Sequence, residues 1–288
     1  MLRPRFLRLL PALLLVGVLA APAAAQRSSQ SLPASARSPV ARSVRAGDPR
    51  IEQYRQRTLQ RAASGHALTP AKQRSEAKVL AQAGKLRASL RASKDDRPIL
   101  VILEGADGAG KSSTIERLRH AFDGARELEV THFGAPPADA EQVHWMKRFF
   151  DKLPHKGQVA VWDRSYYGRA VYDPYYGLAD GKLTDATIDE INGFEQLLSG
   201  KVRVVKIYLD ASGDRQAKTI GKREAIAPEK LAESDYVAFR DRKEIRGYFK
   251  DAIARTGKHV AWHKVDMDDR GDARLEIMKL LRRELAED

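Results

Sequence analysis

Short apolar runs alternate with helical segments along most of this chain. The first three runs consist mainly of β-branched and aliphatic residues, as in strands that are buried on both faces of a parallel sheet, and the last alternates such residues with polar ones. They cover residues 99–103, 158–162, 204–209 and 259–265. A last segment carries apolar residues at helical spacing on one face, namely Leu275, Met278, Leu281 and Leu285. The alternation predicts one α/β domain, a parallel sheet with helices on both faces.

The first third of the chain has a different pattern. Residues 26–48 are rich in Ser, Ala, Arg and Pro and show no apolar period, which predicts a disordered linker. Helix formers dominate residues 49–92, with breaks near Gly65 and Pro70, so we expect two N-terminal helices there. Because these helices are more polar than buried ones, they should pack on one face only or contact a partner subunit of a homo-oligomer.

A complete phosphate-binding loop follows the first apolar run. The segment Gly105-Ala106-Asp107-Gly108-Ala109-Gly110-Lys111-Ser112 matches the pattern G-x-x-x-x-G-K-[ST]. It lies between a predicted strand and a helical pattern, which the motif requires and which disfavours a mere glycine-rich turn. Exposed backbone amides and the positive end of a helix dipole together bind polyanions. Lys111 is expected to reach the terminal phosphates, and the Ser112 hydroxyl to bind Mg²⁺.

A second site follows the apolar run at residues 158–162. That run ends at Asp163, and Arg164 and Arg169 follow within the next six residues. A carboxylate at the carboxyl end of a strand is where a P-loop enzyme keeps the acid associated with Mg²⁺. Guanidinium groups suit phosphate oxygens because their donors form a fixed fork. The alternative is a surface turn with ordinary charges, which the nearby phosphate loop disfavours.

With these two sites the chain resembles the polyphosphate kinase 2 family, from about Arg97 to Leu285. Glu104 to Lys111 is similar to the family signature Glu-Gly-x-Asp-x-x-Gly-Lys, including Asp107, which generic phosphate loops lack. Further matches, in the family's order, are Gly134 to Pro137, Glu141, Arg148, Leu153-Pro154, Gly157, Asp163-Arg164-Ser165, Phe194-Glu195, Ser212 and Gln216. The resemblance implies a P-loop kinase-like three-layer fold with a helical lid, over residues 93–288.

Members of this family transfer a terminal phosphoryl group between inorganic polyphosphate and a nucleotide, with Mg²⁺, and the resemblance implies the same reaction here. It favours a nucleoside diphosphate over a monophosphate, because residues 163–169 resemble one branch of the family. The implied catalytic residues are Asp107, Lys111, Asp163, Arg164 and Arg169, and the implied metal ligands are Asp107, Ser112 and Asp163. The implied nucleotide- and phosphate-binding residues are Gly105, Gly108, Gly110, Lys111, Ser112, Ser113, Arg148, Lys222 and Arg223. Such a transfer requires no covalent nucleophile.

Two places depart from the family pattern: the lid segment, and Gly168, where an Asn or Glu is common. The family's lid carries a Trp-Lys-x-Ser stretch and a later Trp, whereas residues 221–235 keep Lys222, Arg223, Ser234 and Asp235 without the tryptophans. The choice of nucleotide therefore stays open. The pair Lys222-Arg223 fits a substrate-binding lid and a solvated helix face equally well.

The amino end has the three parts of a secretory signal peptide over residues 1–25. Arg3, Arg5 and Arg8 precede an apolar stretch at residues 9–20, and small residues lead to Ala25, where cleavage is expected. The pattern predicts export, to the periplasm if the source is bacterial, with no membrane span after cleavage. An uncleaved anchor is the alternative, although the stretch is short of the ~20 residues that a span needs. A mis-assigned gene start would instead leave the protein in the cytoplasm.

The net charge of +13, or +10 without the three arginines of the signal peptide, favours polyanionic partners. No helix-turn-helix, zinc-finger or aromatic RNA-binding signature points to nucleic acid. Polyphosphate is the other candidate, and basic residues are frequent near the two sites. They are predicted either to line a channel for a long anion or to lie on solvated helix faces: Arg117, Arg119, Lys147, Arg148, Lys152, Lys156, Arg164 and Arg169.

Two other functions stay open. An ATP-dependent kinase of the nucleoside-monophosphate type shares the phosphate loop, the Asp-Arg strand end and a basic lid, but not Asp107 within the loop. A non-catalytic exported polyphosphate-binding protein fits the export signal and the missing lid tryptophans. Such a binder has less need of the complete Mg²⁺ site that Lys111, Ser112 and Asp163 indicate.

Overall fold

The computed structural model describes residues 48–63, 69–136 and 142–286. The predicted signal peptide and the predicted linker, apart from Asp48, lie outside the described residues, as do Gly65, Pro137 and Glu141. Within the described ranges no helix has both the length and the apolar character needed to cross a bilayer.

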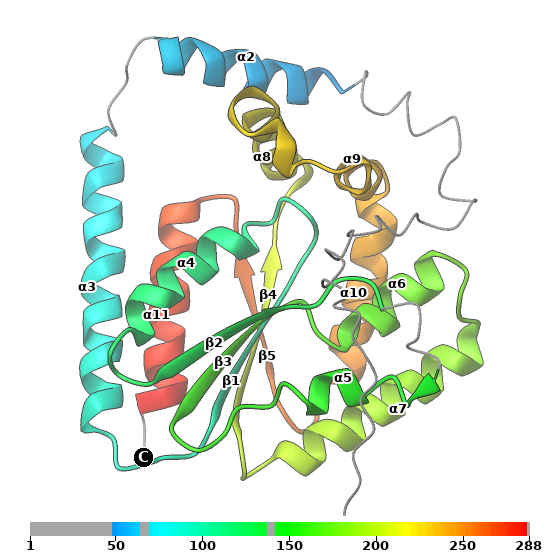
Figure 1. Ribbon diagram of the computed structural model, residues 1–288. Helices are drawn as coiled ribbons and strands as arrows, with labels where there is room; N and C mark the ends of the chain where they lie inside the picture. Colours follow the sequence, from blue (N-terminus) through cyan, green and yellow to red (C-terminus); the bar gives the residue numbers. More distant parts are fainter. Residues whose placement is uncertain (1–47, 64–68, 137–141, 287–288) are drawn as a thin grey trace, which may run out of the picture. The chain divides into compact units, whose positions relative to one another are not determined.

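Five parallel strands form one sheet in the order β2-β3-β1-β4-β5 (Figure 1). The strands are β1 (Ile99–Glu104), β2 (Glu127–His132), β3 (Gln158–Asp163), β4 (Arg203–Asp210) and β5 (Trp262–Asp266). In the central strand β1, Val101 lies opposite Val161 of β3 and Val205 of β4. Every residue of β1 and β3 is buried, as expected for strands that helices cover on both faces. The predicted parallel sheet is confirmed.

The two edge strands differ from the sequence prediction. The last strand begins at Trp262 rather than His259, because the chain needs the preceding residues to turn back from a helix that ends at Arg255. Pairing with β4 starts only where Trp262 lies opposite Lys206. Strand β2 was not among the apolar runs, since it pairs with β3 alone and alternates polar with apolar residues.

Helices α3 (Pro70–Ala92), α4 (Lys111–Phe122) and α11 (Arg270–Ala286) cover one face of the sheet. Their apolar side chains share a core with Val101 of β1. Helix α3 packs on one face only, as predicted, and the buried residues are Val79, Ala83, Leu86 and Leu90. In α11, Met278, Leu281 and Leu285 are buried as predicted, whereas Leu275 is only partly buried.

The opposite face of the sheet is covered by α5 (Lys147–Phe150), α6 (Tyr167–Tyr175), α7 (Gly181–Leu198) and α10 (Arg242–Arg255). Aromatic rings fill this second core. The ring of Trp162, on β3, lies 5.1 Å from that of Phe133, 6.0 Å from that of Phe149 and 6.2 Å from that of Tyr166. Because Trp162 is fully buried, it fixes the end of β3, where Asp163 follows.

Between β4 and α10 the chain forms α8 (Gly213–Ile226), a 3-10 turn η3 (Pro228–Lys230) and α9 (Glu233–Arg240). Helix α2 (Pro49–Ala63) packs on α8 (Figure 1). The contact is so close that a Cβ on Gly221 would lie 2.3 Å from the Ile51 carbonyl oxygen. The segment predicted as a lid is therefore helical, and the first N-terminal helix packs against it.

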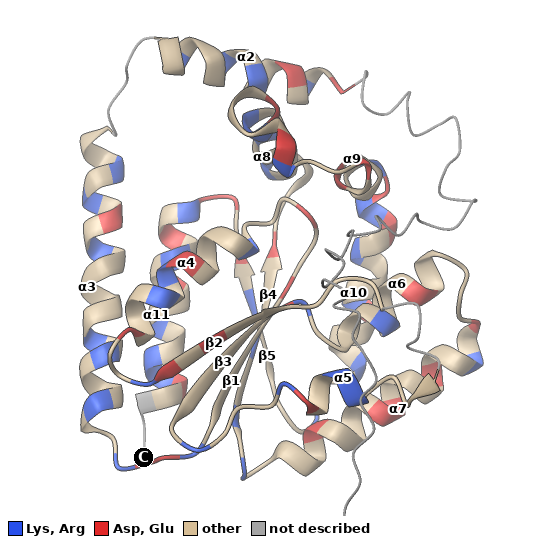
Figure 2. Cartoon of the chain, in the orientation of Figure 1, with Lys and Arg blue, Asp and Glu red and all other residues tan. Residues whose placement is uncertain are grey.

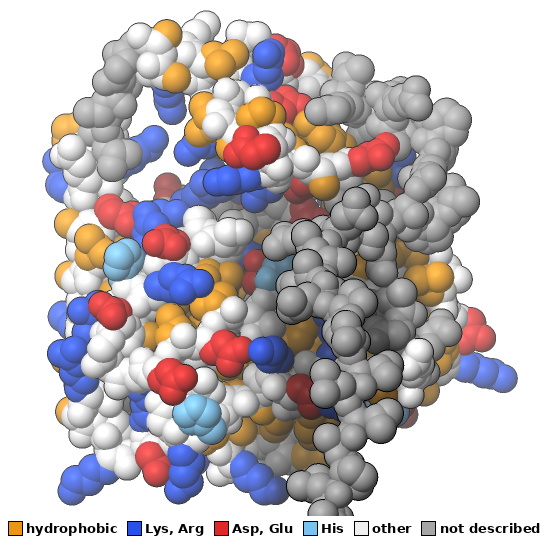
Figure 3. All heavy atoms as spheres, in the orientation of Figure 1, with side chains coloured by type: hydrophobic (Ala, Val, Ile, Leu, Met, Phe, Trp, Pro, Cys, Tyr) orange, Lys and Arg blue, Asp and Glu red, His pale blue; other side chains and the backbone are white. Residues whose placement is uncertain are grey.

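Charged residues lie mostly on helices and connections, while the central strands carry few of them (Figure 2). On the face shown in Figure 3, Lys and Arg side chains are interspersed with Asp and Glu. The net charge of +13 therefore does not by itself locate a binding surface on that face. The binding site is therefore identified from the contacts of individual residues.

Candidate active site

The phosphate-binding loop depends on three glycines whose backbone conformations are unfavourable for other residues. The angle φ is 144° at Gly105, 83° at Gly108 and 110° at Gly110. A Cβ on Gly105 would also lie 2.6 Å from the carbonyl oxygen of Leu209, on β4. The loop can therefore pass this close to the end of β4 only with glycine at this position.

Lys111 is the first residue of α4, and its ammonium group points back into the loop. Nζ donates hydrogen bonds to the carbonyl oxygens of Gly105, at 2.7 Å, and Ala106, at 3.3 Å. Burial lowers the pKa of Lys111 and the charge of Arg164 lowers it further, against the opposing effect of nearby carboxylates. Phosphate oxygens entering the loop would offer this ammonium group stronger, anionic acceptors than the two carbonyls.

The two serines after Lys111 are used differently. Ser113 donates its hydroxyl hydrogen to the carbonyl oxygen of Gly110, at 2.9 Å, and so stabilises the first turn of α4. Ser112 is exposed. Of these two predicted ligand residues, Ser112 therefore has the hydroxyl that is open to a metal ion, while Ser113 supports the loop.

Asp163 lies beside the loop because β3 pairs with β1, with Asp163 opposite Leu103. Its Oδ2 is 3.2 Å from Nδ1 of His132, the last residue of β2. Its Oδ1 is buried and has no hydrogen-bond partner among the residues that the structure describes. A buried carboxylate oxygen without a partner indicates a place for a cation or a water molecule. His132 was missed, since the edge strand that carries it was not predicted.

Arg164 adopts a left-handed backbone conformation, with φ of 66°, which is uncommon outside glycine. Its backbone N–H donates a hydrogen bond to the carbonyl oxygen of Leu103 at 3.0 Å, and its guanidinium group forms an ion pair with Asp107. The same group lies 5.6 Å from the centre of the Tyr172 ring. Contacts on both sides thus hold the strained turn and aim Arg164 at the loop.

The carboxylate of Asp107 is ionised in this arrangement. Burial acts to raise the pKa of Asp107, but the charges of Arg164 and Lys111 outweigh it and hold the pKa below its ordinary value. The Lys111 ammonium nitrogen is 4.0 Å from Asp107 Oδ1. Asp107 therefore links the two cations in this structure, and its role as a metal ligand stays a proposal.

Glu104, the last residue of β1, is a site residue that the sequence analysis did not assign. Its side chain is buried, and Oε1 accepts a hydrogen bond from Oγ of Ser165 at 2.7 Å. Oε2 has no partner among the described residues. Burial raises the pKa of Glu104 to about 7, against the effect of the Ser165 hydrogen bond. The family signature contains this glutamate, but only the structure shows its burial and its contact with Ser165.

Arg148 and Arg169 lie at the carboxyl edge of the sheet, and each guanidinium group contacts an aromatic ring. The Arg148 guanidinium lies 5.3 Å from the ring centre of Phe133, which directly follows β2. The Arg169 guanidinium lies 5.3 Å from the ring centre of Trp145, and its Nε is 3.1 Å from Oδ2 of Asp173. Both predicted arginines are thus held near the end of β3, and Trp145, which had no predicted role, supports one of them.

The two predicted lid residues are not equivalent. Arg223 forms an ion pair with Asp235, with Nη1 and Oδ1 3.2 Å apart. The charge of Arg223 also lowers the pKa of Asp107, after the larger effects of burial, Arg164 and Lys111. Lys222 is exposed. The charge of Arg223 therefore acts on Asp107 of the loop, whereas Lys222 lies at the surface.

The eight basic residues predicted to line a channel or to lie on solvated helix faces do not all lie at the phosphate loop. Residues directly before β3 lie at the amino edge of the sheet, opposite the phosphate loop, because β3 runs parallel to β1. Lys156 there pairs with Asp96 at 3.3 Å, just before β1. Other members pair locally or with other elements: Arg117 with Glu76, Lys147 with Asp151 and Lys152 with Glu129. Of the predicted channel, Arg148, Arg164 and Arg169 lie at the carboxyl edge.

Comparison with known proteins agrees with this site. A family model described as polyphosphate kinase 2 matches residues 69–288. A polyphosphate:AMP phosphotransferase from Pseudomonas syringae pv. tomato is 28% identical over 211 residues, which are 70% of this chain and 42% of that protein. ADP-polyphosphate phosphotransferase 2 from Rhizobium meliloti is 29% identical over 196 residues, which are 65% of this chain and 62% of that protein. The chain thus spans less than two thirds of the length of these relatives.

A solved structure is similar over most of the fold. The crystal structure of polyphosphate kinase 2 from Arthrobacter aurescens TC1 superimposes with a TM-score of 0.67 at 25% identity, covering 77% of this chain and 81% of that one. The match of the family model extends over most of the chain and includes α3, the phosphate loop and the Asp163 turn. The chain therefore belongs to the polyphosphate kinase 2 family.

Proposed function

We propose that this protein transfers a phosphoryl group between inorganic polyphosphate and a nucleotide, with Mg²⁺. The observation that carries the proposal is a convergence at the carboxyl edge of the sheet. There the phosphate loop with Lys111, the partly unpartnered carboxylate of Asp163 and the guanidinium group of Arg164 lie side by side. Relatives named for transfer between polyphosphate and AMP or ADP support the substrate class.

The chain's own residues would act by positioning and by neutralising charge. The backbone N–H groups of the glycine-rich loop and the ammonium group of Lys111 would donate hydrogen bonds to the oxygens of one phosphate group. Arg164 and Arg169 would meet the equatorial oxygens of the transferring group, where negative charge is spread in a loose transition state. Each is oriented by a carboxylate and an aromatic ring, so little reorganisation is required when charge moves.

The residues present fit a magnesium ion. Mg²⁺ takes oxygen ligands and is usually bound by one or two carboxylates together with substrate phosphates and water. The unpartnered Oδ1 of Asp163 and the exposed hydroxyl of Ser112 would hold it, and Asp107 would join them if it released Arg164. When bound, the ion supplies positive charge at the phosphate oxygens. The described residues contain no group of three or more His, Asp or Glu side chains placed to hold a metal ion.

We propose a nucleoside diphosphate as the preferred nucleotide, because residues 163–169 resemble that branch of the family. The test mixes purified protein with Mg²⁺, long-chain polyphosphate and either ADP or AMP. ATP formed from ADP faster than ADP is formed from AMP supports the proposal. A nucleoside-monophosphate kinase is indicated instead if ATP phosphorylates AMP while polyphosphate gives no product with either nucleotide. Binding of polyphosphate without any transfer indicates the non-catalytic alternative.

We also propose that the protein is exported and that its mature form starts near Gln26. The charged, apolar and small-residue segments of residues 1–25 support this. Amino-terminal sequencing of the protein from its native host tests it. Soluble cytoplasmic protein that retains Met1 to Ala25 would contradict export.

A further inference from the structure

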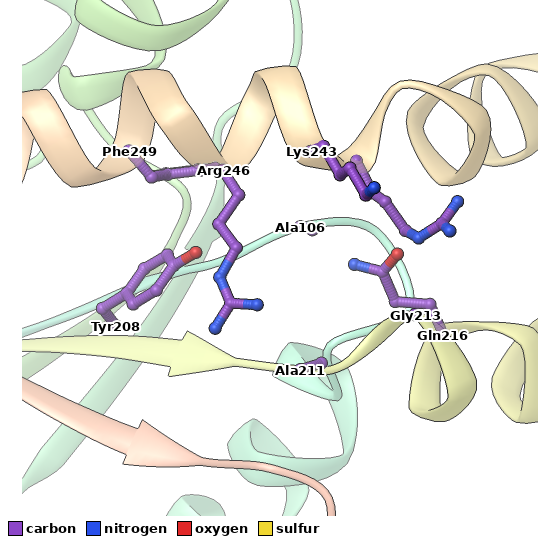
Figure 4. A pocket seen from close by; sticks show the side chains of 9 residues that line it. Ala106, Tyr208, Ala211, Gly213, Gln216, Lys243, Arg246 and Phe249 are labelled. Carbon is purple, nitrogen blue, oxygen red and sulfur yellow. The ribbon is translucent and has the colours of Figure 1, made fainter.

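A pocket of about 190 Å³ lies beside the phosphate loop, on the side of β4 rather than of β3. Ala106 of the loop lines it, together with Tyr208 at the end of β4 and Phe249 of α10 (Figure 4). The sheet order places it across the loop from Asp163 and Arg164. We call it the α10 pocket, because α10 contributes three basic residues to its lining: Arg242, Lys243 and Arg246.

The α10 pocket keeps an excess of positive charge. Arg246 forms an ion pair with Asp210, but the same carboxylate also pairs with Lys264, at 2.8 Å, so one anion is shared by two cations. Arg242 donates a hydrogen bond to the carbonyl oxygen of Phe239, which is neutral. Lys243 is exposed. The side chains of Lys243 and Arg246 project from α10 toward the loop and β4 in Figure 4. Three basic residues with one shared carboxylate favour an anionic ligand.

A buried amide gives an independent indication of a ligand. Gln216 of α8 lines the pocket, is 3% exposed, and has an Oε1 without a hydrogen-bond partner among the described residues. Buried polar groups are nearly always satisfied, so a group from a ligand or water is expected there. Because the two ends of an amide exchange by rotation, Gln216 can also present its NH₂ group to an anionic oxygen.

We propose that the α10 pocket binds the part of a polyphosphate chain that lies beyond the phosphate held in the loop. The inference rests on the proposed function and names the path of its polyanionic substrate. Ala106 belongs to both the loop and the pocket, so a chain held in the loop passes directly into the pocket. In the proposed function the loop holds one phosphate group, and the arginines beside β3 meet the transferring group. Three further basic residues on the other side suit an anion that continues.

The test is equilibrium binding of long-chain polyphosphate and, separately, of ADP. The variants are Lys243→Ala, Arg246→Gln and the double variant, with Lys250→Ala as control. Lys250 is exposed on the same helix and does not line the pocket. Each pocket variant should weaken polyphosphate binding about two- to fivefold, since each removes a partly exposed charge contact. The double variant should weaken it about tenfold and make it less sensitive to salt. ADP affinity should stay unchanged.

Three results would overturn the inference. The first is an equal loss in Lys250→Ala, and the second is polyphosphate affinity that the double variant leaves unchanged. The third is weaker ADP binding with unchanged polyphosphate binding, which would assign the pocket to the nucleotide. Failure of the proposed function looks different. Wild-type protein would then form no ATP from polyphosphate and ADP, yet would bind polyphosphate more tightly than the double variant does.

Discussion

At the scale of single residues, Lys111 and Asp163 are expected to be needed for transfer but not for folding. Burial lowers the pKa of Lys111, and Asp163 has an unpartnered oxygen, so neither charge contributes much to the folded state. Lys111→Ala and Asp163→Asn should each reduce kcat about 100-fold or more with a similar Tm. Steady-state kinetics and thermal melts measure both, with the exposed Arg119→Ala on α4 as control. Near-normal turnover in either variant would contradict the site.

Glu104 should make stability depend on pH. Burial raises its pKa from 4.5 to about 7, so the folded protein binds this proton more tightly than the unfolded chain does. Protonated Glu104 therefore adds to the free energy of unfolding. This contribution is fully present below the pKa of the unfolded chain and is lost as the pH rises through the pKa of the folded protein, in total on the order of 3 kcal/mol. Glu104→Gln, which keeps an acceptor for Ser165, should therefore be more stable than wild type at high pH but not at low pH. Thermal melts at pH 5 and pH 8 compare the two, and equal differences at both would contradict the shift.

At the scale of elements, the strand–loop–helix unit depends on the close approach of the loop to β4. Gly105→Ala combines a left-handed backbone with a Cβ 2.6 Å from the Leu209 carbonyl oxygen. It should destabilise the protein by about 2 kcal/mol or more and weaken nucleotide binding. Gly193→Ala in α7 is the matched control, since a Cβ there meets nothing within 4 Å. That control should stabilise the helix by about 0.5–1 kcal/mol in chemical unfolding.

At the scale of the whole molecule, a buried network joins β4, α6, α7 and the end of α10. Lys206 Nζ is 2.7 Å from Glu195 Oε2, 2.8 Å from the Tyr167 hydroxyl and 2.6 Å from the Thr256 carbonyl oxygen. Both charged side chains are fully buried. Lys206→Met should cost about 3–5 kcal/mol of unfolding free energy, because it leaves the Glu195 charge buried and unpaired. Lys201→Met, at an exposed position, is the control.

The pairing itself can be separated from the loss of either side chain. Glu195→Gln removes the negative charge with little change of shape, and the double variant removes both charges. If the two groups form one pair, the double variant should lose less stability than the sum of the single variants, by about 0.5–3 kcal/mol. Denaturant unfolding of all four proteins measures this. Additive losses would mean that Lys206 and Glu195 stabilise the fold separately.

The parts of this protein that could be predicted from the sequence are those whose structure depends on residues close together in the chain. The order strand, phosphate loop and helix follows from β1 and residues 105–112, because glycine spacing and a continuous buried run are local patterns. Asp163 followed for the same reason, as the acid that ends a buried strand. Strand β2 and the start of β5 were not predicted correctly, since edge strands pair on one side and need no continuous apolar run.

Only the tertiary structure decided which charges share the site. Strand direction places Lys156 at the opposite edge of the sheet, beside Asp96, although it stands only seven residues before Asp163 in the chain. Sheet order brings Arg246 to the phosphate loop from more than a hundred residues away. Pairing and burial act between distant segments, so spacing along the chain determines the chemistry of the loop but not the charged groups that surround it.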